Sequence, residues 1–196
     1  MENLEPIRIV GLCFNFWQLV ANSAEEMVRL GNQASLQYEG LDNPSRSEFE
    51  NHIKWSDSRV AEPVLFNFYH GIELSLKALI AAKGQESPGI HKLSELAQSV
   101  AELYNDSSLN DFYSKYIETP RLHVILREFC QNSKSDMDLF YQSFKYPSSR
   151  QGITFNHPAL HSRLEEGLEL FAGIKRDIEL MKPIIERYIV VECQVS

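Results

Sequence analysis

Apolar residues recur at intervals of three and four along most of the chain, which is the spacing of one face of an α-helix. Three of these stretches are long, and we predict a helix in each: residues 12–38, 59–84 and 158–191. The middle stretch is apolar on almost every side, so its helix is predicted to be central. Pro183 is expected to kink or divide the last helix, because a proline inside a helix has no N–H to donate.

Shorter helical patterns lie between the long ones and are separated by glycine, proline and polar residues. They cover residues 48–56, 91–104, 111–117, 120–130 and 136–144. No alternating run rich in Val, Ile and Thr appears apart from the tail at 189–191. The pattern predicts an all-α fold, an antiparallel bundle of three or four long helices with shorter ones attached. We expect a single domain over residues 1–196, with its core at about 9–191.

Composition narrows the class of protein. Hydrophobic residues make up 43% of the chain and charged residues 23%, which is typical of a globular domain. The net charge is −8, which argues against a body coated in positive charge for non-specific nucleic-acid binding but leaves room for a small basic site. The longest apolar stretch carries charged residues, so we expect no membrane span and a cytoplasmic protein.

The three cysteines, Cys13, Cys130 and Cys193, are few and far apart. This spacing does not fit a disulfide framework or a structural zinc site. We expect three free thiols in a reducing compartment.

A narrow polar stripe interrupts the central helix. His70, Glu73 and Lys77 are three and four residues apart, so they project within one sector of an otherwise apolar helix. One interpretation is a solvated Glu–Lys pair on a surface, in the favourable order. The other is a polar seam at a helix–helix or subunit contact, for which we expect Glu73 to be buried and to contact Lys77 or His70.

The stretch Tyr69–Ile80 resembles the central helix of HEPN domains (higher eukaryotes and prokaryotes nucleotide-binding). It carries their H-x-x-E-x-x-x-K pattern, and Gly84 and His91 follow as a glycine turn and a histidine that opens the next helix. The resemblance is good over about residues 60–105. It implies a helical bundle, usually a homodimer, in RNA-processing, prokaryotic defence or toxin–antitoxin systems. It further implies RNA or a nucleotide as ligand, and an antitoxin or nucleotidyltransferase as a partner protein.

Catalytic HEPN members resemble metal-independent endoribonucleases in which four to six residues stand between an Arg and a His. Histidine suits proton transfer near neutral pH, and arginine stabilises charge on phosphate. Two pairs fit this spacing, Arg150 with His157 and, as a second choice, Arg46 with His52. Ten arginines and six histidines produce about one such pair by chance, so the position in the chain matters more than the spacing. Arg150 and His157 lie before the last long helix, which is closer to the order of the family.

His157 and His161 are four residues apart, a spacing that can bind zinc on a helix. No third ligand is evident, since Glu165 is a candidate by geometry alone. Glycine-rich phosphate loops are absent as well. We therefore expect neither a metal nor a cofactor.

Three functions remain open at this point. The preferred one is a binding or regulatory module in an RNA- or nucleotide-linked defence, toxin–antitoxin or stress pathway. The alternatives are an endoribonuclease that uses an Arg/His pair, and a helical scaffold without catalysis.

A homodimer is expected from the amount of apolar helix surface. Phe14, Phe16 and Trp17 point in different directions from one turn, and one face of a bundle cannot bury all three. The long last helix is predicted to project apolar residues that need a partner, namely Ile184, Ile185, Tyr188 and Ile189. We expect the first or the last helix to lie in the contact.

Overall fold

The computed structural model describes residues 5–32, 45–86, 89–144, 152 and 154–194. Within these residues the chain is all-helical, with eight α-helices, two short 3₁₀ helices and no extended strand. This confirms the predicted fold class. The elements in chain order are α1 (Glu5–Arg29), α2 (Arg46–Ile53), α3 (Asp57–Ala82), α4 (Leu93–Tyr104), α5 (Ser107–Ile117), η1 (Thr119–Arg121), α6 (Val124–Ser133), α7 (Met137–Ser143), η2 (His157–Leu160) and α8 (Leu164–Gln194).

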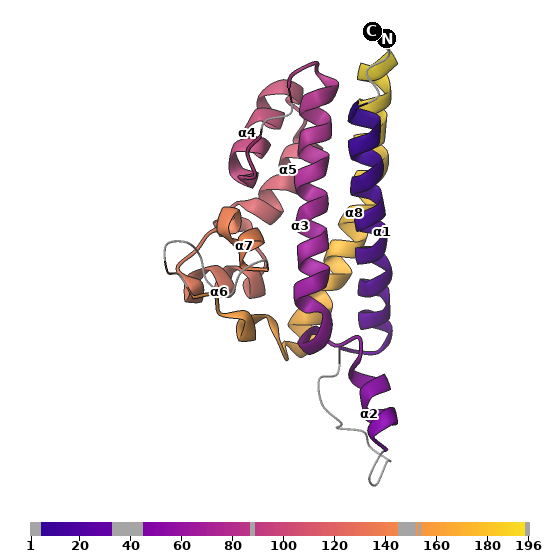
Figure 1. Ribbon diagram of the computed structural model, residues 1–196, viewed down its shortest axis with the longest axis vertical. Coiled ribbons are helices and arrows are strands. Elements are labelled where there is room, and N and C mark those ends of the chain that lie inside the picture. Colours follow the sequence, from indigo (N-terminus) through magenta and orange to yellow (C-terminus); the bar gives the residue numbers. More distant parts are fainter. Residues whose placement is uncertain (1–4, 33–44, 87–88, 145–151, 153, 195–196) are drawn as a thin grey trace.

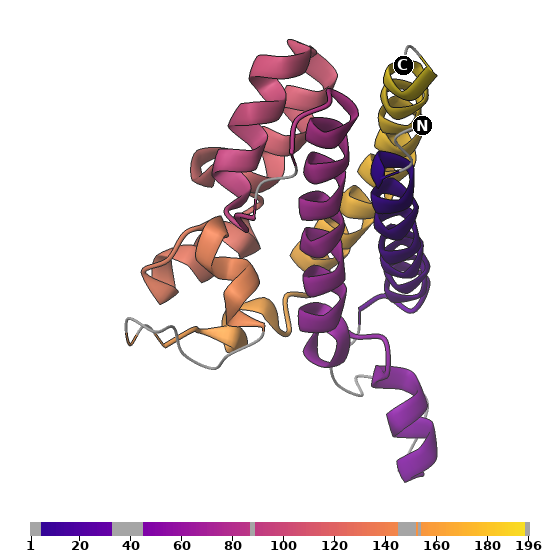
Figure 2. The same cartoon turned by 45° about the horizontal axis from the view of Figure 1, so that its top comes forward.

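The three long helices α1, α3 and α8 pack side by side, with α1 antiparallel to the other two (Figure 1). On the opposite side of α3, α4 and α5 lie toward its C-terminal end, and α6, α7 and η2 lie toward its N-terminal end (Figure 2). The short helix α2 extends beyond the end of the bundle. The central position predicted for the second long helix is confirmed, because α3 contacts both layers.

The first helix starts and ends earlier than the apolar pattern predicts. It begins at Glu5 rather than Leu12, and Val10 in the added turns is buried. It ends at Arg29 rather than at residue 38, because Gly31 and Asn32 have positive φ angles of 74° and 49° that a helix cannot continue through.

The last helix is interrupted near its start and not at its proline. The predicted helix of residues 158–191 consists of η2 and α8, and between them Ser162 has a φ of 56°. The expectation that Pro183 divides the helix is wrong, since α8 is continuous through it. Pro183 lies on the exposed side, where water can bond the carbonyl that lacks an N–H partner.

The core between α1 and α3 is built around Trp17. Its indole N–H donates to the carbonyl of Phe68 at 3.1 Å, and its ring is fully buried. A Cβ added at Gly71 would lie 2.2 Å from the indole nitrogen, so the close approach of the two helices requires glycine there. Phe14 and Phe16 are only partly buried, which confirms that one face does not bury all three aromatic residues.

The expectation that the last helix projects its apolar residues is wrong for two of them. Ile185 and Ile189 belong to the core, and Ile184 and Tyr188 pack against it. The exposed apolar residues of α8 are Leu164, Leu180, Val190 and Val191. In the part of the chain that the structure describes, no helix is both long and apolar enough to cross a membrane.

Candidate functional site

One side of α3 carries most of the polar and aromatic side chains that are candidates for binding or catalysis. Its side chains follow each other at spacings of four, four, three and four: Glu62, Phe66, His70, Glu73 and Lys77. These spacings place them along one side of the helix. Near the N-terminal end, His157 and His161 of the η2 segment approach Glu62; near the other end, His91 approaches Glu73.

Glu62 joins two histidines that are about a hundred residues further along the chain. The distance from Glu62 Oε1 to His161 Nε2 is 2.7 Å, which is a hydrogen bond. The distance from the same oxygen to His157 Nδ1 is 3.8 Å, which is too long for one. All three side chains are about one quarter to one third exposed, so a ligand can reach them.

His157 is held by aromatic rings. Its imidazole makes edge contacts with three of them, at centroid distances of 5.8 to 6.5 Å: Phe129, Phe144 and Phe155. The Nδ1 atom is buried and has no hydrogen-bond partner in the structure. A buried polar atom without a partner is costly, and such atoms in native proteins are often those that bind a ligand or act in a reaction. His157 is therefore a residue of this site whose hydrogen bonding is incomplete.

The turn that carries the two histidines is fixed by a buried carboxylate. Asp57, in the first turn of α3, accepts the backbone N–H of Ser162 at 2.8 Å and of Arg163 at 2.7 Å. Ser162 directly follows His161, so these bonds set the position of His161 against Glu62. Sequence reasoning did not single out Asp57 or Glu62, because each contact joins residues far apart in the chain.

The structure gives the side-chain position of only one residue in each of the two candidate catalytic pairs. Arg150 lies outside the described residues, so the structure positions only the histidine of the preferred pair. Arg46 is exposed and binds Glu50 of its own helix at 2.9 Å. The backbone of His52 lies in α2, and its side chain is outside what the structure describes.

Glu73, the middle residue of the polar seam in α3, is buried, as predicted, while the His70 side chain is 27% exposed. Glu73 is 3% exposed, and its Oε1 accepts hydrogen bonds from Lys77 Nζ and His91 Nδ1, both at 2.8 Å. His70 Nδ1 is 3.9 Å from Oε2, which has no hydrogen-bond partner. The interpretation as a solvated surface pair is wrong. His91, which sequence analysis used only as a family marker, is part of this cluster and comes from the segment before α4.

The ionisation of Glu73 follows from these contacts. Burial by itself would raise the pKa of the carboxyl group. The hydrogen bonds and positive charges of Lys77 and His91 outweigh burial, so the pKa of Glu73 lies below its ordinary value. Glu73 is therefore a buried anion that joins α3 to the start of α4.

A continuous series of ring contacts links α1 to His157. Phe16 meets the edge of His70 at 4.6 Å between centroids, and His70 stacks with Phe66 at 6.1 Å. Phe66 contacts Phe144 at 6.4 Å, and Phe144 contacts His157 at 6.1 Å. We call these five rings the aromatic band. It crosses α3 and ends at the Glu62 cluster.

Among the described residues, no group of three His, Cys, Asp or Glu side chains is arranged to hold a metal ion. The three cysteines are free thiols, as expected. Burial raises the pKa of the Cys130 thiol to about 11, so it is protonated near neutral pH.

The fold and the site define an all-helical bundle whose central helix carries buried and half-exposed polar residues. A comparison with protein-family models matches the HEPN domain over residues 55–176, more than half of the chain, and the protein belongs to the HEPN domain family. This confirms the resemblance found in the sequence. No curated protein and no solved structure matches the chain. Helix α1, which covers one side of α3, lies outside the matched residues.

Proposed function

We propose that this protein is a homodimeric HEPN module that binds single-stranded RNA or a nucleotide in a prokaryotic defence, toxin–antitoxin or stress pathway. The observation that supports this proposal is that the aromatic band ends at the cluster of Glu62, His157 and His161. Aromatic rings stack on unpaired bases, and carboxylate and imidazole groups bond their edges. An antitoxin or nucleotidyltransferase partner belongs to the same proposal.

The charge of the protein limits how it binds RNA. The chain carries a net charge of −8, so it cannot neutralise many phosphates. Arg59 is exposed one turn before Glu62 on α3 and provides one positive charge at this end of the helix. Binding therefore relies on stacking and base contacts, and its affinity depends weakly on salt concentration.

Fluorescence anisotropy with labelled single-stranded RNA oligonucleotides of mixed sequence tests this proposal. Phe66→Leu keeps an apolar side chain and removes the ring, and it should weaken binding by roughly fivefold or more. Arg59→Ala should weaken binding as well, while Arg187→Ala is the matched control because Arg187 is exposed near the C-terminal end of α8. If neither RNA nor AMP or ATP binds saturably, the proposal is wrong and the scaffold alternative stands.

A metal-independent endoribonuclease is the second candidate, and the bonding of His157 favours it. In this reaction the ribose 2′-oxygen attacks the adjacent phosphorus, and the P–O5′ bond breaks. The products are a 2′,3′-cyclic phosphate and a 5′-hydroxyl. His157 would accept the 2′-hydroxyl proton and return it to the departing 5′-oxygen, and the Glu62 carboxylate 3.8 Å away would stabilise the imidazolium by its charge. Arg150 would stabilise the phosphorane charge.

Cleavage of a labelled RNA in the presence of EDTA tests the second candidate. His157→Ala should abolish cleavage while the thermal unfolding curve stays cooperative. Detection of a 2′,3′-cyclic phosphate end would support the mechanism. Full activity in His157→Ala would remove the proposed site, and loss of activity with EDTA would revive a metal role for His157 and His161.

A further inference from the structure

A pocket lies away from the aromatic band, between α4, α5 and the start of α7. It is an open pocket of about 520 Å³, within the usual size range of small-molecule sites. Its floor is apolar and comes from three different helices, with Ala97 and Ala101 from α4, Ile117 from α5 and Met137 from α7. The proposed function does not use this pocket.

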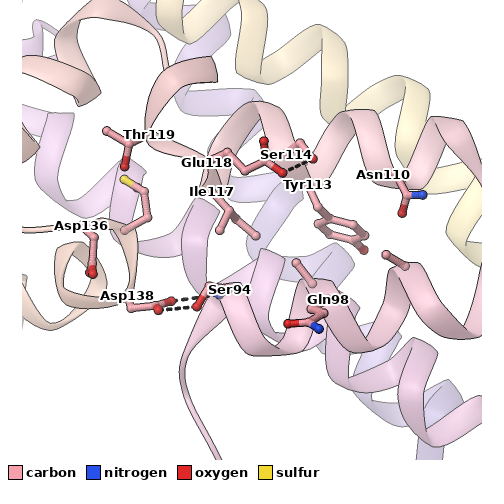
Figure 3. Close-up of a pocket in the computed structure, with 13 residues that line it drawn as sticks. Ser94, Gln98, Asn110, Tyr113, Ser114, Ile117, Glu118, Thr119, Asp136 and Asp138 are labelled. Atoms are coloured by element: carbon pink, nitrogen blue, oxygen red, sulfur yellow. Dashed lines mark hydrogen bonds between the residues drawn. The ribbon is translucent and has the colours of Figure 1, made fainter.

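The rim of the pocket has two chemically different ends (Figure 3). Asp136 and Asp138 lie at one end, and Gln98, Asn110 and the ring of Tyr113 lie at the other. Glu118 and Ile117 are placed between the two ends. An elongated ligand would therefore meet carboxylates at one end and amide groups at the other.

The carboxylates at the rim are bonded to neutral donors. Asp138 accepts from the backbone and hydroxyl of Ser94, Asp136 accepts the backbone N–H of Leu139 at 3.0 Å, and Glu118 accepts from the Ser114 hydroxyl at 2.9 Å. These bonds fix the carboxylates in place without neutralising them. Each carboxylate can accept further bonds, because its two oxygens offer about four acceptor sites.

The charge of the pocket is negative. Its thirteen described lining residues include three acidic side chains and no Lys, Arg or His. The nearby Lys92 binds Glu95 at 2.6 Å, and the pKa of Lys92 is raised first by Glu95 and then, more weakly, by Asp138 and Asp136. Such a pocket favours a cation and disfavours a phosphate group.

We propose that this pocket binds a small organic amine. The protonated amine would bond Asp136 at the acidic end, and Glu118 would add negative charge along the middle of the pocket. An apolar or aromatic body would lie on Ala97, Ala101 and Ile117, and a polar group at the far end would bond Gln98 or Asn110. The occupant differs in charge from the RNA or nucleotide proposed for the aromatic band. The two proposals are therefore independent.

Isothermal titration calorimetry with tyramine tests the proposal, because tyramine carries an amine, a ring and a hydroxyl in a row. We expect saturable binding, with backbone NMR shifts confined to α4, α5 and the start of α7. The matched ligand is 4-ethylphenol, which is tyramine without the amine. It should bind at least about tenfold more weakly. AMP should not compete for the pocket.

The variant Glu118→Gln combined with Asp136→Asn removes two charges and keeps the side-chain sizes, and asparagine still caps α7. This double variant should fold as the wild type does and should weaken tyramine binding by at least about tenfold. Glu179→Gln with Glu186→Gln on α8 removes the same charge elsewhere and should leave binding unchanged. Absence of saturable binding by tyramine, equal binding of 4-ethylphenol, or equal loss in both double variants would overturn the proposal.

Discussion

Asn32 and Asp57 bond each other twice. The Asn32 amide donates to Asp57 Oδ2 at 3.0 Å, and the Asn32 side-chain oxygen accepts the backbone N–H of Asp57 at 2.6 Å. Both residues are almost completely buried. Because Asp57 also accepts the N–H groups of Ser162 and Arg163, this pair joins the end of α1, the start of α3 and the start of α8.

Replacing Asp57 by alanine should destabilise the protein strongly. The change leaves one N–H of the buried Asn32 amide and the backbone N–H groups of Ser162 and Arg163 without their carboxylate acceptor, while the other amide N–H still bonds the Leu164 carbonyl at 3.2 Å. Each donor that water cannot reach then costs about 1–3 kcal/mol. We expect the free energy of unfolding to fall by at least about 3 kcal/mol, measured by urea denaturation. Asp111→Ala, which removes an exposed aspartate from α5, is the control and should cost less than about 1 kcal/mol. A similar small loss for Asp57→Ala would contradict the role of the pair.

Gly167 in α8 should not tolerate a side chain. A Cβ added there would lie 2.4 Å from the Asn32 amide nitrogen and 3.1 Å from Asp57 Oδ2, so Gly167→Ala would push the pair apart. We expect a loss of about 1–3 kcal/mol in unfolding free energy. Gly173 is in the same helix with nothing within 4 Å of an added Cβ, and Gly173→Ala should be neutral or stabilise by up to about 1 kcal/mol. Equal effects of the two substitutions would refute the argument from close contact.

The Glu73–Lys77 pair should show strong coupling in a double-mutant cycle. Lys77→Met removes the ammonium group from a buried carboxylate that His91 still bonds, so we expect a loss of about 3 kcal/mol. Adding Glu73→Leu should restore most of that loss, because no buried charge remains. Unfolding midpoints of the wild type, the two single variants and the double variant provide the measurement. Additive effects would show that the two residues act separately.

Glu73 should also make the protein less stable in acid. Its pKa is lowered in the folded state from an ordinary value of 4.5, so the unfolded chain takes up the proton first as the pH falls. The contribution is therefore complete above about pH 4.5 and is lost as the pH falls through the folded value. Denaturation series between neutral and acidic pH should show a steeper loss for the wild type than for the Glu73→Leu/Lys77→Met double variant. Parallel curves would contradict this assignment.

The periodicity of apolar residues correctly predicted the helices that pack against the core along their whole length. The second long helix was predicted at residues 59–84 and lies at Asp57–Ala82, because its buried residues continue to both ends. The end of α1 was misplaced by nine residues. The turn at Gly31 and Asn32 is stabilised by the contact with Asp57, which lies 25 residues further along the chain and leaves no mark on local spacing.

The contacts of the candidate site likewise include some that spacing within one helix predicts and others that it cannot. Glu73 was predicted to be buried because it is a charged residue on an otherwise apolar helix, and the Lys77 contact follows from a spacing of four. The contact of His91 with Glu73 depends on the path of the loop before α4. The contact of Glu62 with His161 depends on how α8 begins, so spacing within α3 could not reveal it.

The exposed face of α1 should form a homodimer contact. Leu12 and Leu19 are each 53% exposed and lie on the same side of α1 as Phe16, whose ring touches His70 of the aromatic band. Two-fold pairing through this face would bury apolar surface and bring two aromatic bands together. A stable dimer of this kind buries at least about 1,000 Å² in total.

Light scattering at micromolar concentration should show twice the monomer mass of 22.6 kDa for the wild type. Leu12→Glu with Leu19→Glu places two charges in the contact and should raise the dimer dissociation constant by roughly a hundredfold or more. Leu180→Glu on α8 is the matched control, because Leu180 is equally exposed and lies on a different helix. A wild type that remains monomeric as its concentration rises would refute the dimer. A dimer that only Leu180→Glu disrupts would move the contact from α1 to α8, away from the aromatic band.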